Sequence, residues 1–256
     1  MKILIVGATG SIGRHVVARS LKMGHELKAL LRNPQKSKLL PQGVEIVHGD
    51  VSMPETLAGI CDDIDAVIFT LGSDGQGRIG ARAIDYGGVR NILQTLKQRS
   101  VRIVLMTAIG VTDRDGAYNR RTEAHDWKRR AERLVRASGH PYTIVRPGWF
   151  DYNKSGQQKI VMLQGDKRHS GTPADGVIAR QQIARVLVSA LTDDEATNKT
   201  LELVAEYGDE QQDLTPLFSA LRQDSVMHND GILDIDNMHL SSEPLCVIDD
   251  LTMIAN

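Results

Sequence analysis

The chain has 256 residues and a formal net charge of −1, which gives no reason to expect a nucleic-acid or membrane partner. Its length suits one large domain, or one domain with a small annex, and no apolar run approaches the roughly 20 residues that cross a bilayer. Cys61 and Cys246 are far apart and follow no metal spacing, so we predict reduced, buried thiols, no metal site and a cytoplasmic protein.

The amino terminus combines an apolar run of strand length with three regularly spaced glycines. Lys2–Val6 is followed by Gly7, Gly10 and Gly13, and a helical apolar pattern begins at once. Gly7 permits a tight turn, Gly10 leaves room for a pyrophosphate, and Gly13 allows the helix to pack closely on the strand. Because a helix N-terminus attracts phosphate, we predict a dinucleotide site here, against the alternative of a glycine-rich turn without a ligand.

Strand and helix patterns then alternate along the chain. The expected strands are rich in Val, Ile and Leu without polar alternation: Lys2–Val6, Glu26–Leu31, Glu45–His48, Ala66–Leu71, Arg102–Met106 and Tyr142–Val145. The expected helices between them are Ser11–Lys22, Pro54–Ile60, Ala83–Arg99 and Thr122–Ala137. This order predicts an α/β fold with a doubly wound parallel sheet.

After the last of these strands the pattern is looser. We expect a helix over Ile178–Leu191, a strand over Lys199–Val204 and a short helix over Leu214–Leu221. These elements are expected to lie over the carboxyl ends of the sheet strands, where open α/β sheets bind ligands.

The predicted second strand ends in a basic residue. In dinucleotide folds an acidic side chain at this strand end binds the ribose 2′-hydroxyl, whereas a basic one accommodates a 2′-phosphate. Here Arg32 stands at that place, Lys36 and Lys38 follow, and the next acidic residue is Glu45. A guanidinium can bind a phosphate through two charge-assisted hydrogen bonds, and Arg14 could join it. We therefore predict NADP(H) rather than NAD(H), the alternative being a solvated loop charge.

Two further strand ends carry candidate cofactor contacts. Asp50, in the run Gly49–Val51, could accept from the adenine amino group, unless it only caps the following helix. Leu71 and Gly72 follow the fourth strand, where the backbone must pass close to the adenine ribose. The polar segment 73–78 could then form a lid over the bound cofactor.

The last stretch of the chain differs in composition. From Asp224 to Asn256 there is no Lys or Arg, and seven residues are acidic. Two interpretations are open: a solvated tail, or an acidic C-terminal arm that packs on a basic surface of its own chain or of a second subunit. Apolar residues within the stretch argue against full disorder. Residues 114–136 hold eight basic side chains and are a possible counterpart.

A resemblance to a known family rests on four motifs: Gly-Ala-Thr-Gly-Ser-Ile-Gly at 7–13, Gly49-Asp50-Val51, Asp85-Tyr86-x-Gly88-x-x-Asn91 and Tyr142–Gly148. Together they resemble the atypical short-chain dehydrogenase/reductases, nearest to the NAD(P)H-binding, NmrA-like group and similar to the flavin reductase (biliverdin reductase B) type. The resemblance covers about residues 1–223 and implies a Rossmann-like domain with a small substrate lobe from about residue 149. It implies cofactor contacts at Gly7, Thr9, Gly10, Ser11, Ile12, Arg32, Asp50, Val51, Leu71, Gly72, Thr107, Lys128 and Pro147–Phe150.

The catalytic pattern of that superfamily is incomplete in this chain. In standard members a Tyr four residues before a Lys supplies the proton, and a Ser after the fifth strand polarises the substrate carbonyl. Lys128 matches the Lys, but Ala124 stands at the Tyr position, and Thr107 offers the hydroxyl nearest the place of the Ser. His125, close to Lys128 on the helix, is a possible general acid or else an exposed polar residue on a charged helix.

Aromatic residues indicate where an acceptor could bind. Trp149, Phe150 and Tyr152 follow the strand expected to face the nicotinamide, in a chain with only 4% aromatic residues. They could stack on a flat substrate, or they could pack in the local core. Tyr118, in the loop before the Lys128 helix, could supply a proton or could be a surface residue.

We therefore predict an NADPH-dependent oxidoreductase that transfers hydride to a small flat acceptor, such as a flavin, a quinone or a carbonyl compound. Solvent can protonate such acceptors, so the missing Tyr is less damaging. The main alternative is a non-catalytic NADP(H) sensor or regulatory protein, and Arg32 and the lost Tyr both count against an epimerase with tightly held NAD. The expected partner is a small molecule, and the expected state is a monomer or homodimer.

Overall fold

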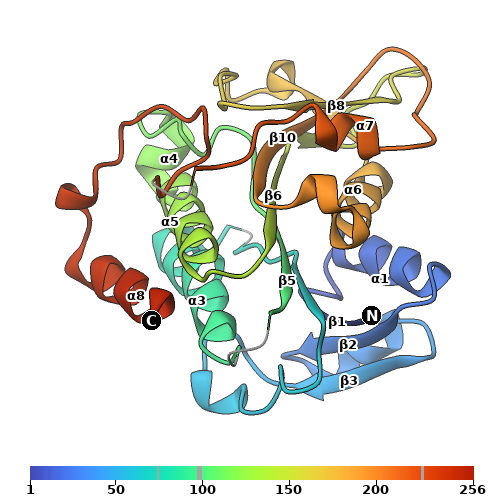
Figure 1. The fold of residues 1–256 in the computed structure, drawn as a ribbon, viewed down its shortest axis with the longest axis vertical. Helices are drawn as coiled ribbons and strands as arrows, with labels where there is room; N and C mark the ends of the chain where they lie inside the picture. The colour runs from blue at the N-terminus through green and yellow to red at the C-terminus, as the bar shows by residue number, and fades with distance from the viewer. Residues whose placement is uncertain (74, 97–99, 226–227) are drawn as a thin grey trace.

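A computed structural model describes residues 1–73, 75–96, 100–225 and 228–256. Within these residues the centre is a ten-stranded sheet in the order β3-β2-β1-β4-β5-β6-β10-β9-β7, with β8 paired to β10 (Figure 1). Neighbours from β3 to β10 along this order run parallel, as in a Rossmann fold, so the predicted fold class is confirmed. The strands are β1 Lys2–Val6, β2 Glu26–Leu31, β3 Val44–His48, β4 Ala66–Phe69, β5 Arg102–Met106, β6 Tyr142–Pro147, β7 Trp149–Phe150, β8 Lys159–Leu163, β9 Val177–Ile178 and β10 Lys199–Glu206.

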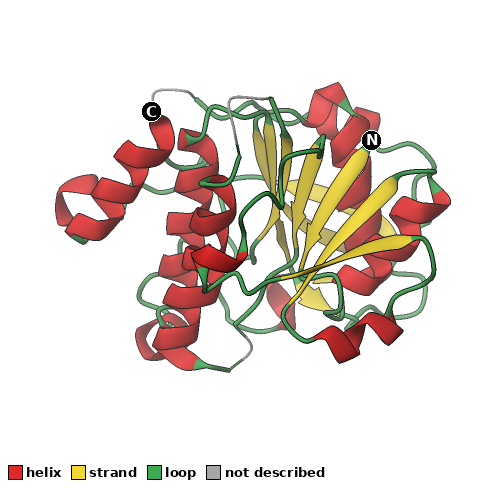
Figure 2. Ribbon diagram, turned by 90° about the horizontal axis from the view of Figure 1, so that it is seen from below, coloured by secondary structure: helices red, strands yellow, loops and turns green. Residues whose placement is uncertain are grey.

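Helices cover both faces of the sheet (Figure 2). On one face α1 packs against α6, and on the other α3 and α5 pack together with α8 on their outer side. Each face has its own apolar core, because β4 and its neighbours bury the side chains that point either way. The helices are α1 Gly13–Lys22, α2 Gly77–Gly80, α3 Gly87–Leu93, α4 Ala117–Thr122, α5 Ala124–Ala137, α6 Arg180–Thr192, α7 Thr215–Ser219 and α8 Leu245–Ala255, with a π-helical stretch over Ala81–Tyr86.

Two of the expected helices are shortened or interrupted near a residue with positive φ. The helix expected over Pro54–Ile60 is only a 3₁₀ turn at Pro54–Thr56, and the left-handed backbone of Gly59 (φ +73°) is incompatible with a continuing helix. The helix expected over Thr122–Ala137 is interrupted at Glu123, which has φ +54°. Asn119 explains that break, because its side-chain oxygen accepts from the amides of His125 and Asp126 and so starts α5 anew.

The helix expected over Ala83–Arg99 begins earlier and ends earlier. It continues from α2 through the π-helical stretch into α3, which ends at Leu93, and residues 97–99 lie outside the described residues. From Trp149 onward the chain adds the strands β7 to β10 to the sheet. The helix α6 packs against α1 and against β5 and β6. The strand β8 and the helix α8 are not among the elements expected from the sequence.

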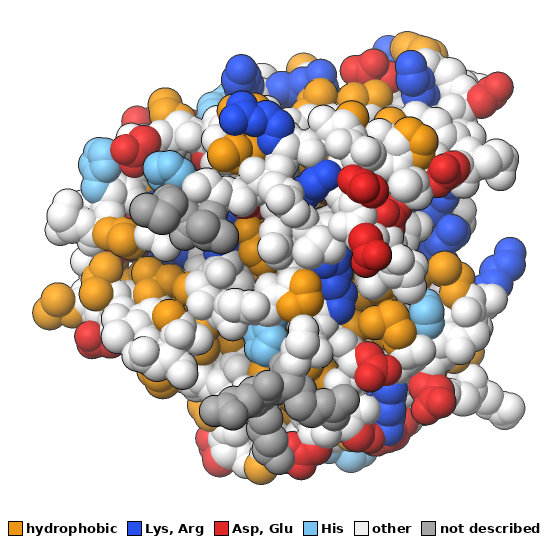
Figure 3. Space-filling view, in the orientation of Figure 1, with side chains coloured by type: hydrophobic (Ala, Val, Ile, Leu, Met, Phe, Trp, Pro, Cys, Tyr) orange, Lys and Arg blue, Asp and Glu red, His pale blue; other side chains and the backbone are white. Residues whose placement is uncertain are grey.

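The described residues of the acidic arm, 224–225 and 228–256, lie against the basic face of α5 in their own chain (Figure 1). In that orientation acidic and basic side chains are interspersed over the surface (Figure 3), in keeping with the net charge of −1. The ion pairs that join the arm to the domain include Asp224–Arg136 (3.3 Å), Asp230–Arg129 (3.0 Å), Asp230–Arg133 (2.7 Å), Asp234–Arg146 (2.6 Å) and Glu243–Arg130 (2.5 Å).

Both cysteines are free thiols; Cys61 is buried, and Cys246 on α8 is partly exposed. Among the described residues, no helix has both the length and the apolar character needed to cross a membrane.

Candidate functional site

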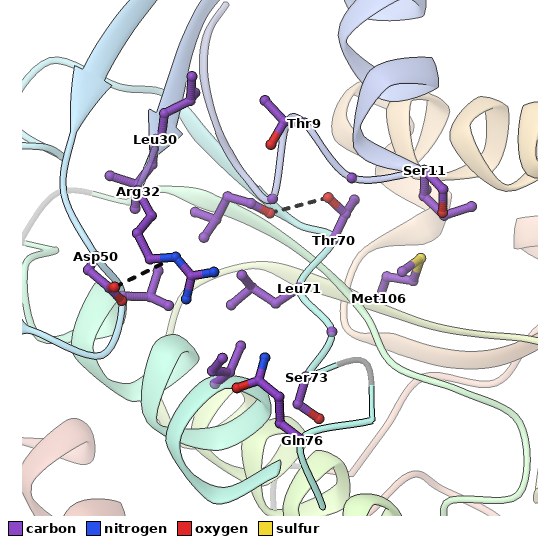
Figure 4. Close-up of a pocket in the computed structure, with 18 of the residues that line it drawn as sticks. Thr9, Ser11, Leu30, Arg32, Asp50, Thr70, Leu71, Ser73, Gln76 and Met106 are labelled. Atoms are coloured by element: carbon purple, nitrogen blue, oxygen red, sulfur yellow. Dashed lines mark hydrogen bonds and ion pairs between the residues drawn. The ribbon is translucent and has the colours of Figure 1, made fainter. Parts of the chain in front are cut away.

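A cleft of about 680 Å³ opens at the carboxyl ends of the parallel strands (Figure 4). Parallel strands bring their carboxyl ends to one edge, so segments distant in the sequence meet there. Residues after β1, β2, β3, β4 and β5 all contribute to its walls. The predicted residues that line it are Gly7, Thr9, Gly10, Ser11, Ile12, Arg32, Asp50, Val51, Leu71, Gly72, Thr107, Lys128 and Phe150.

The glycine loop between β1 and α1 has the geometry of a phosphate cradle. Gly7 has φ +96°, and a Cβ there would lie 2.8 Å from the carbonyl oxygen of Thr70. A Cβ on Gly13 would lie only 2.1 Å from the carbonyl oxygen of Gly7, so the helix sits directly on the turn. Among the described residues, the amides of Ser11, Ile12 and Gly13 have no hydrogen-bond acceptor and remain available to an anion, whereas those of Arg14 and His15 donate to the carbonyl oxygens of Gly10 and Ile12. Gly13 therefore belongs to the packing of this loop and not to the cleft lining.

Arg32 and Asp50 face each other at the far end of the cleft (Figure 4). The Arg32 Nε lies 3.9 Å from the Asp50 Oδ2, and the Arg32 side chain is 66% exposed, so most of its hydrogen-bond donors are free for a ligand. Lys36 also lines the cleft, whereas Lys38 and Arg14 are exposed outside its described lining. Although partial burial opposes it, hydrogen bonds from Ser52 and the Arg32 charge lower the pKa of Asp50. Asp50 is thus a negatively charged hydrogen-bond acceptor beside the positively charged, exposed guanidinium of Arg32.

Residues of the Asp85-to-Asn91 motif pack behind Val51 and Leu71, two residues that line the cleft. The Asn91 side-chain amide donates to the carbonyl oxygen of Val51 (2.7 Å). A Cβ on Gly88 would approach the side chains of Val51 and Leu71 to 3.0 Å. The motif therefore positions two lining residues by close packing and does not itself reach the ligand space.

Lys128 lies at the opposite end of the cleft with a defined partner. Its Nζ is 2.5 Å from the Oδ1 of Asp85, whose other oxygen accepts from the Ser73 hydroxyl (2.6 Å). The Asp85 side chain is almost fully buried and that of Lys128 is 17% exposed, so the ammonium is held at the cleft wall. Asp85 was part of a sequence motif, but no pattern indicated that it pairs with a lysine 43 residues away.

Thr107 also lines the cleft, and its hydroxyl already makes a hydrogen bond within the protein. The Oγ1 of Thr107 donates to the Oε1 of Glu132 on α5 (2.7 Å). Glu132 is fully buried between the guanidinium groups of Arg146 and Arg136. Sequence reasoning missed Glu132; the only signal available was an acidic residue one helical turn after Lys128.

His125 and Tyr118 occupy different places relative to the cleft. Tyr118 on α4 lines it, whereas the His125 ring lies beneath Gly110, with its centroid 5.2 Å from that of Tyr118. Within the described part of the chain, the buried Nδ1 of His125 has no hydrogen-bond partner. Burial lowers the pKa of His125, so the neutral imidazole prevails at pH 7.

Of the three aromatic residues predicted to bind the acceptor, one lines the cleft and two lie outside its described lining. Phe150 lines the cleft, with the Arg180 guanidinium 5.3 Å from its ring centroid. Trp149 and Tyr152 are exposed outside the described lining and meet edge to face at 6.1 Å. Pro147 is also outside that lining, and its carbonyl oxygen accepts from the amide of Ile109.

The segment expected to be a lid does reach the cleft. Ser73, Gly75 and Gln76 line it, while Asp74 lies outside the described residues. Arg78 donates to the carbonyl oxygen of Arg120 (2.8 Å), which ties this segment to the helix that carries Tyr118.

Comparison with known proteins gives consistent matches. The profile of a family described as NAD(P)H-binding matches residues 7–194. An isoflavone reductase homolog, A622, from Nicotiana tabacum is 31% identical over 79% of this chain and 67% of its own length. Sanguinarine reductase from Eschscholzia californica is 29% identical over 86% of this chain and 95% of its own. A solved structure from Bacillus halodurans, provisionally described as an NAD-dependent epimerase/dehydratase, superposes with a TM-score of 0.70 at 25% identity, covering 86% of this chain and all of that one.

Proposed function

Because the chain belongs to the NAD(P)H-binding family, we propose that it is an NADPH-dependent oxidoreductase that transfers hydride to a small flat acceptor, a flavin, a quinone or a carbonyl compound. The observation that carries the proposal is the cleft itself. One continuous space joins a glycine phosphate cradle and Arg32 at one end to Thr107, Lys128 and Phe150 at the other. The reductases among the relatives support the reaction class.

The residues of the cleft divide the work by their chemistry. The amides of the Gly7–Gly13 loop bind the pyrophosphate, and Arg32 binds the 2′-phosphate. Lys128 donates to the nicotinamide ribose, and Thr107 contacts the ribose or the carboxamide. When bound, the dinucleotide supplies the hydride, and the protein orients it against the acceptor. Phe150 lines the end of the cleft where the acceptor binds, with Trp149 and Tyr152 nearby. These residues belong to a small substrate lobe that begins near residue 149.

The proton does not require the standard Tyr in this proposal. Ala124 has no proton to give, and a reduced flavin or quinone can take its proton from water. A hydroxyl is nevertheless available in the cleft at Tyr118, which is 51% exposed. His125 is the poorer candidate, because it is neutral at pH 7 and lies outside the described cleft lining.

An acceptor screen tests the proposal against the sensor alternative. We expect the purified protein to oxidise NADPH, followed by loss of absorbance, with at least one member of a panel of flavins, quinones and aldehydes. Lys128→Ala is expected to lower kcat/KM about 100-fold, since it removes the ammonium at the cleft wall. Tight NADPH binding without turnover on any acceptor would favour the regulatory function instead.

The cofactor preference has a separate test. We expect Arg32→Ala to weaken NADPH binding by about 10- to 100-fold, the value of a charge-assisted phosphate contact, while NADH binding stays nearly unchanged. Lys38→Ala is the matched control, because it removes a positive charge from the same segment outside the described cleft lining. Titration calorimetry with both nucleotides measures the difference, and an equal loss for NADPH and NADH would contradict the 2′-phosphate role.

A further inference from the structure

We propose that the acidic arm is part of the cofactor site, and that Asp234 is a positioning residue that fixes the direction of the Thr107 hydroxyl through Arg146 and Glu132. The ligand named here rests on the proposed function. The chain of contacts that carries the inference does not, because it is complete within the protein.

The contacts run without a gap from the arm to the cleft. Asp234 receives two hydrogen bonds from the Arg146 guanidinium, at 2.7 and 2.6 Å. The same guanidinium donates to both oxygens of Glu132, at 3.0 and 2.6 Å. Glu132 in turn accepts from Thr107 at 2.7 Å. Arg146 is therefore clamped between two carboxylates, one of which belongs to the arm.

Burial makes this clamp sensitive to the loss of either carboxylate. Side-chain exposure is 0% for Arg146, 0% for Glu132 and 1% for Asp234, so water cannot replace a missing partner. Glu202 also lies near Arg146, at 3.3 Å. Burial raises the pKa of Glu202 to about 8, so it does not provide a full charge at pH 7. Asp234, whose pKa is lowered by Arg146 in spite of burial, provides the second charge.

The clamp determines what Thr107 can offer a ligand. Because its hydroxyl proton points to Glu132, the lone pairs of Oγ1 face the cleft. Thr107 then accepts a hydrogen bond, as from a carboxamide N–H or a ribose hydroxyl, and does not polarise a substrate carbonyl. Without Asp234 the guanidinium keeps Glu132 and the largely neutral Glu202, and we expect Glu132 and Thr107 to lose their fixed orientation.

A second set of contacts joins the arm to residues that follow Asp85 in the sequence. Asp250 on α8 accepts from the Tyr86 hydroxyl (2.8 Å) and pairs with Arg90 (3.3 Å). Tyr86 directly follows Asp85, the partner of Lys128. The arm therefore also packs against the segment that carries Asp85, with the Tyr86 side chain buried.

The test compares two Asp-to-Asn changes within the arm. We expect Asp234→Asn to weaken NADPH binding about 10-fold in the full chain, measured by calorimetry. Asp236→Asn, the same change two residues away at an exposed side chain that pairs only with His239 among the described residues, should stay within about twofold. The Thr107→Val/Asp234→Asn double variant should bind no worse than Thr107→Val, because both changes remove the same interaction.

The outcomes separate this inference from its alternatives. Wild-type affinity in Asp234→Asn would overturn it, and so would losses that multiply in the double variant, which would indicate a purely structural role. If Asp234→Asn does not fold, Asp234→Glu keeps the charge but displaces it, and should lower affinity at a nearly unchanged melting temperature; unchanged affinity would again overturn it. A wild-type protein that does not bind NADPH would contradict the proposed function instead.

Discussion

Arg146→Met is expected to lower the free energy of unfolding by about 3–5 kcal/mol, the usual result of removing one partner from a buried ion pair. The guanidinium is fully buried and bonded to Glu132 and Asp234, and Glu202 lies 3.3 Å away. Met fills much of the volume, but it leaves Asp234 without its guanidinium partner and leaves Glu132 with Arg136 alone (3.4 Å), in a region that water does not reach. Urea titration followed by circular dichroism measures the loss.

Arg102→Met is the matched control for that experiment. Arg102 is also a buried arginine on a central strand, but its guanidinium donates to the carbonyl of Ala190 and the hydroxyls of Thr143 and Thr197. Its removal leaves neutral acceptors unpaired, so the expected loss is smaller, about 1–3 kcal/mol. Equal losses for the two variants would show that the buried carboxylates around Arg146 carry no special cost.

Gly13→Ala is expected to abolish measurable dinucleotide binding, with at least a 100-fold rise in Kd, and to destabilise the fold by about 1–3 kcal/mol. The added Cβ would meet the backbone of Gly7 at 2.1 Å and that of Ala8 at 2.9 Å, and a backbone cannot rotate away as a side chain can. The start of α1 must therefore move off the turn, which misplaces the amides to which we assign phosphate binding.

Gly10→Ala separates the two effects of that substitution. Its Cβ would meet only the Gly7 carbonyl oxygen, at 3.2 Å, so the fold should be nearly as stable as the wild type. Binding should still fall, because the methyl group occupies the space assigned to the pyrophosphate. Calorimetry with NADPH and thermal melting distinguish the variants; unimpaired binding in Gly13→Ala would contradict a cradle role for the loop.

The parts of the fold and site that follow local patterns were predictable from the sequence. The strand, glycine turn and helix over Lys2–Lys22 depend on residues adjacent in the chain, and the structure has them with α1 beginning two residues later than expected. Arg32 and Asp50 were found because a parallel sheet brings its strand ends to one edge. The predicted strand order is therefore enough to place residues that directly follow a parallel strand.

The features that depend on contacts between distant segments were not predictable. Nothing local indicates that Asn119 caps the helix after Glu123, so one helix was expected where there are two. Glu132 looked like one more charge on a charged helix face, although packing buries it completely. The composition of the arm favoured a basic counterpart, but it could not pair Asp234 with Arg146 across 88 residues.

The separation of Arg146 and Asp234 in the sequence also sets the interval between their synthesis on the ribosome. At a synthesis rate of about 5–20 residues per second, the 88 residues between Arg146 and Asp234 take about 4 to 18 s to be made. Throughout that interval β6, α5 and the glycine loop have already been synthesised, while Arg146 lacks Asp234, its second carboxylate partner. A nascent chain can therefore pair the strands that precede residue 234 before Asp234 is made, and in the proposed arrangement Thr107 acquires its fixed orientation only after that residue has been synthesised.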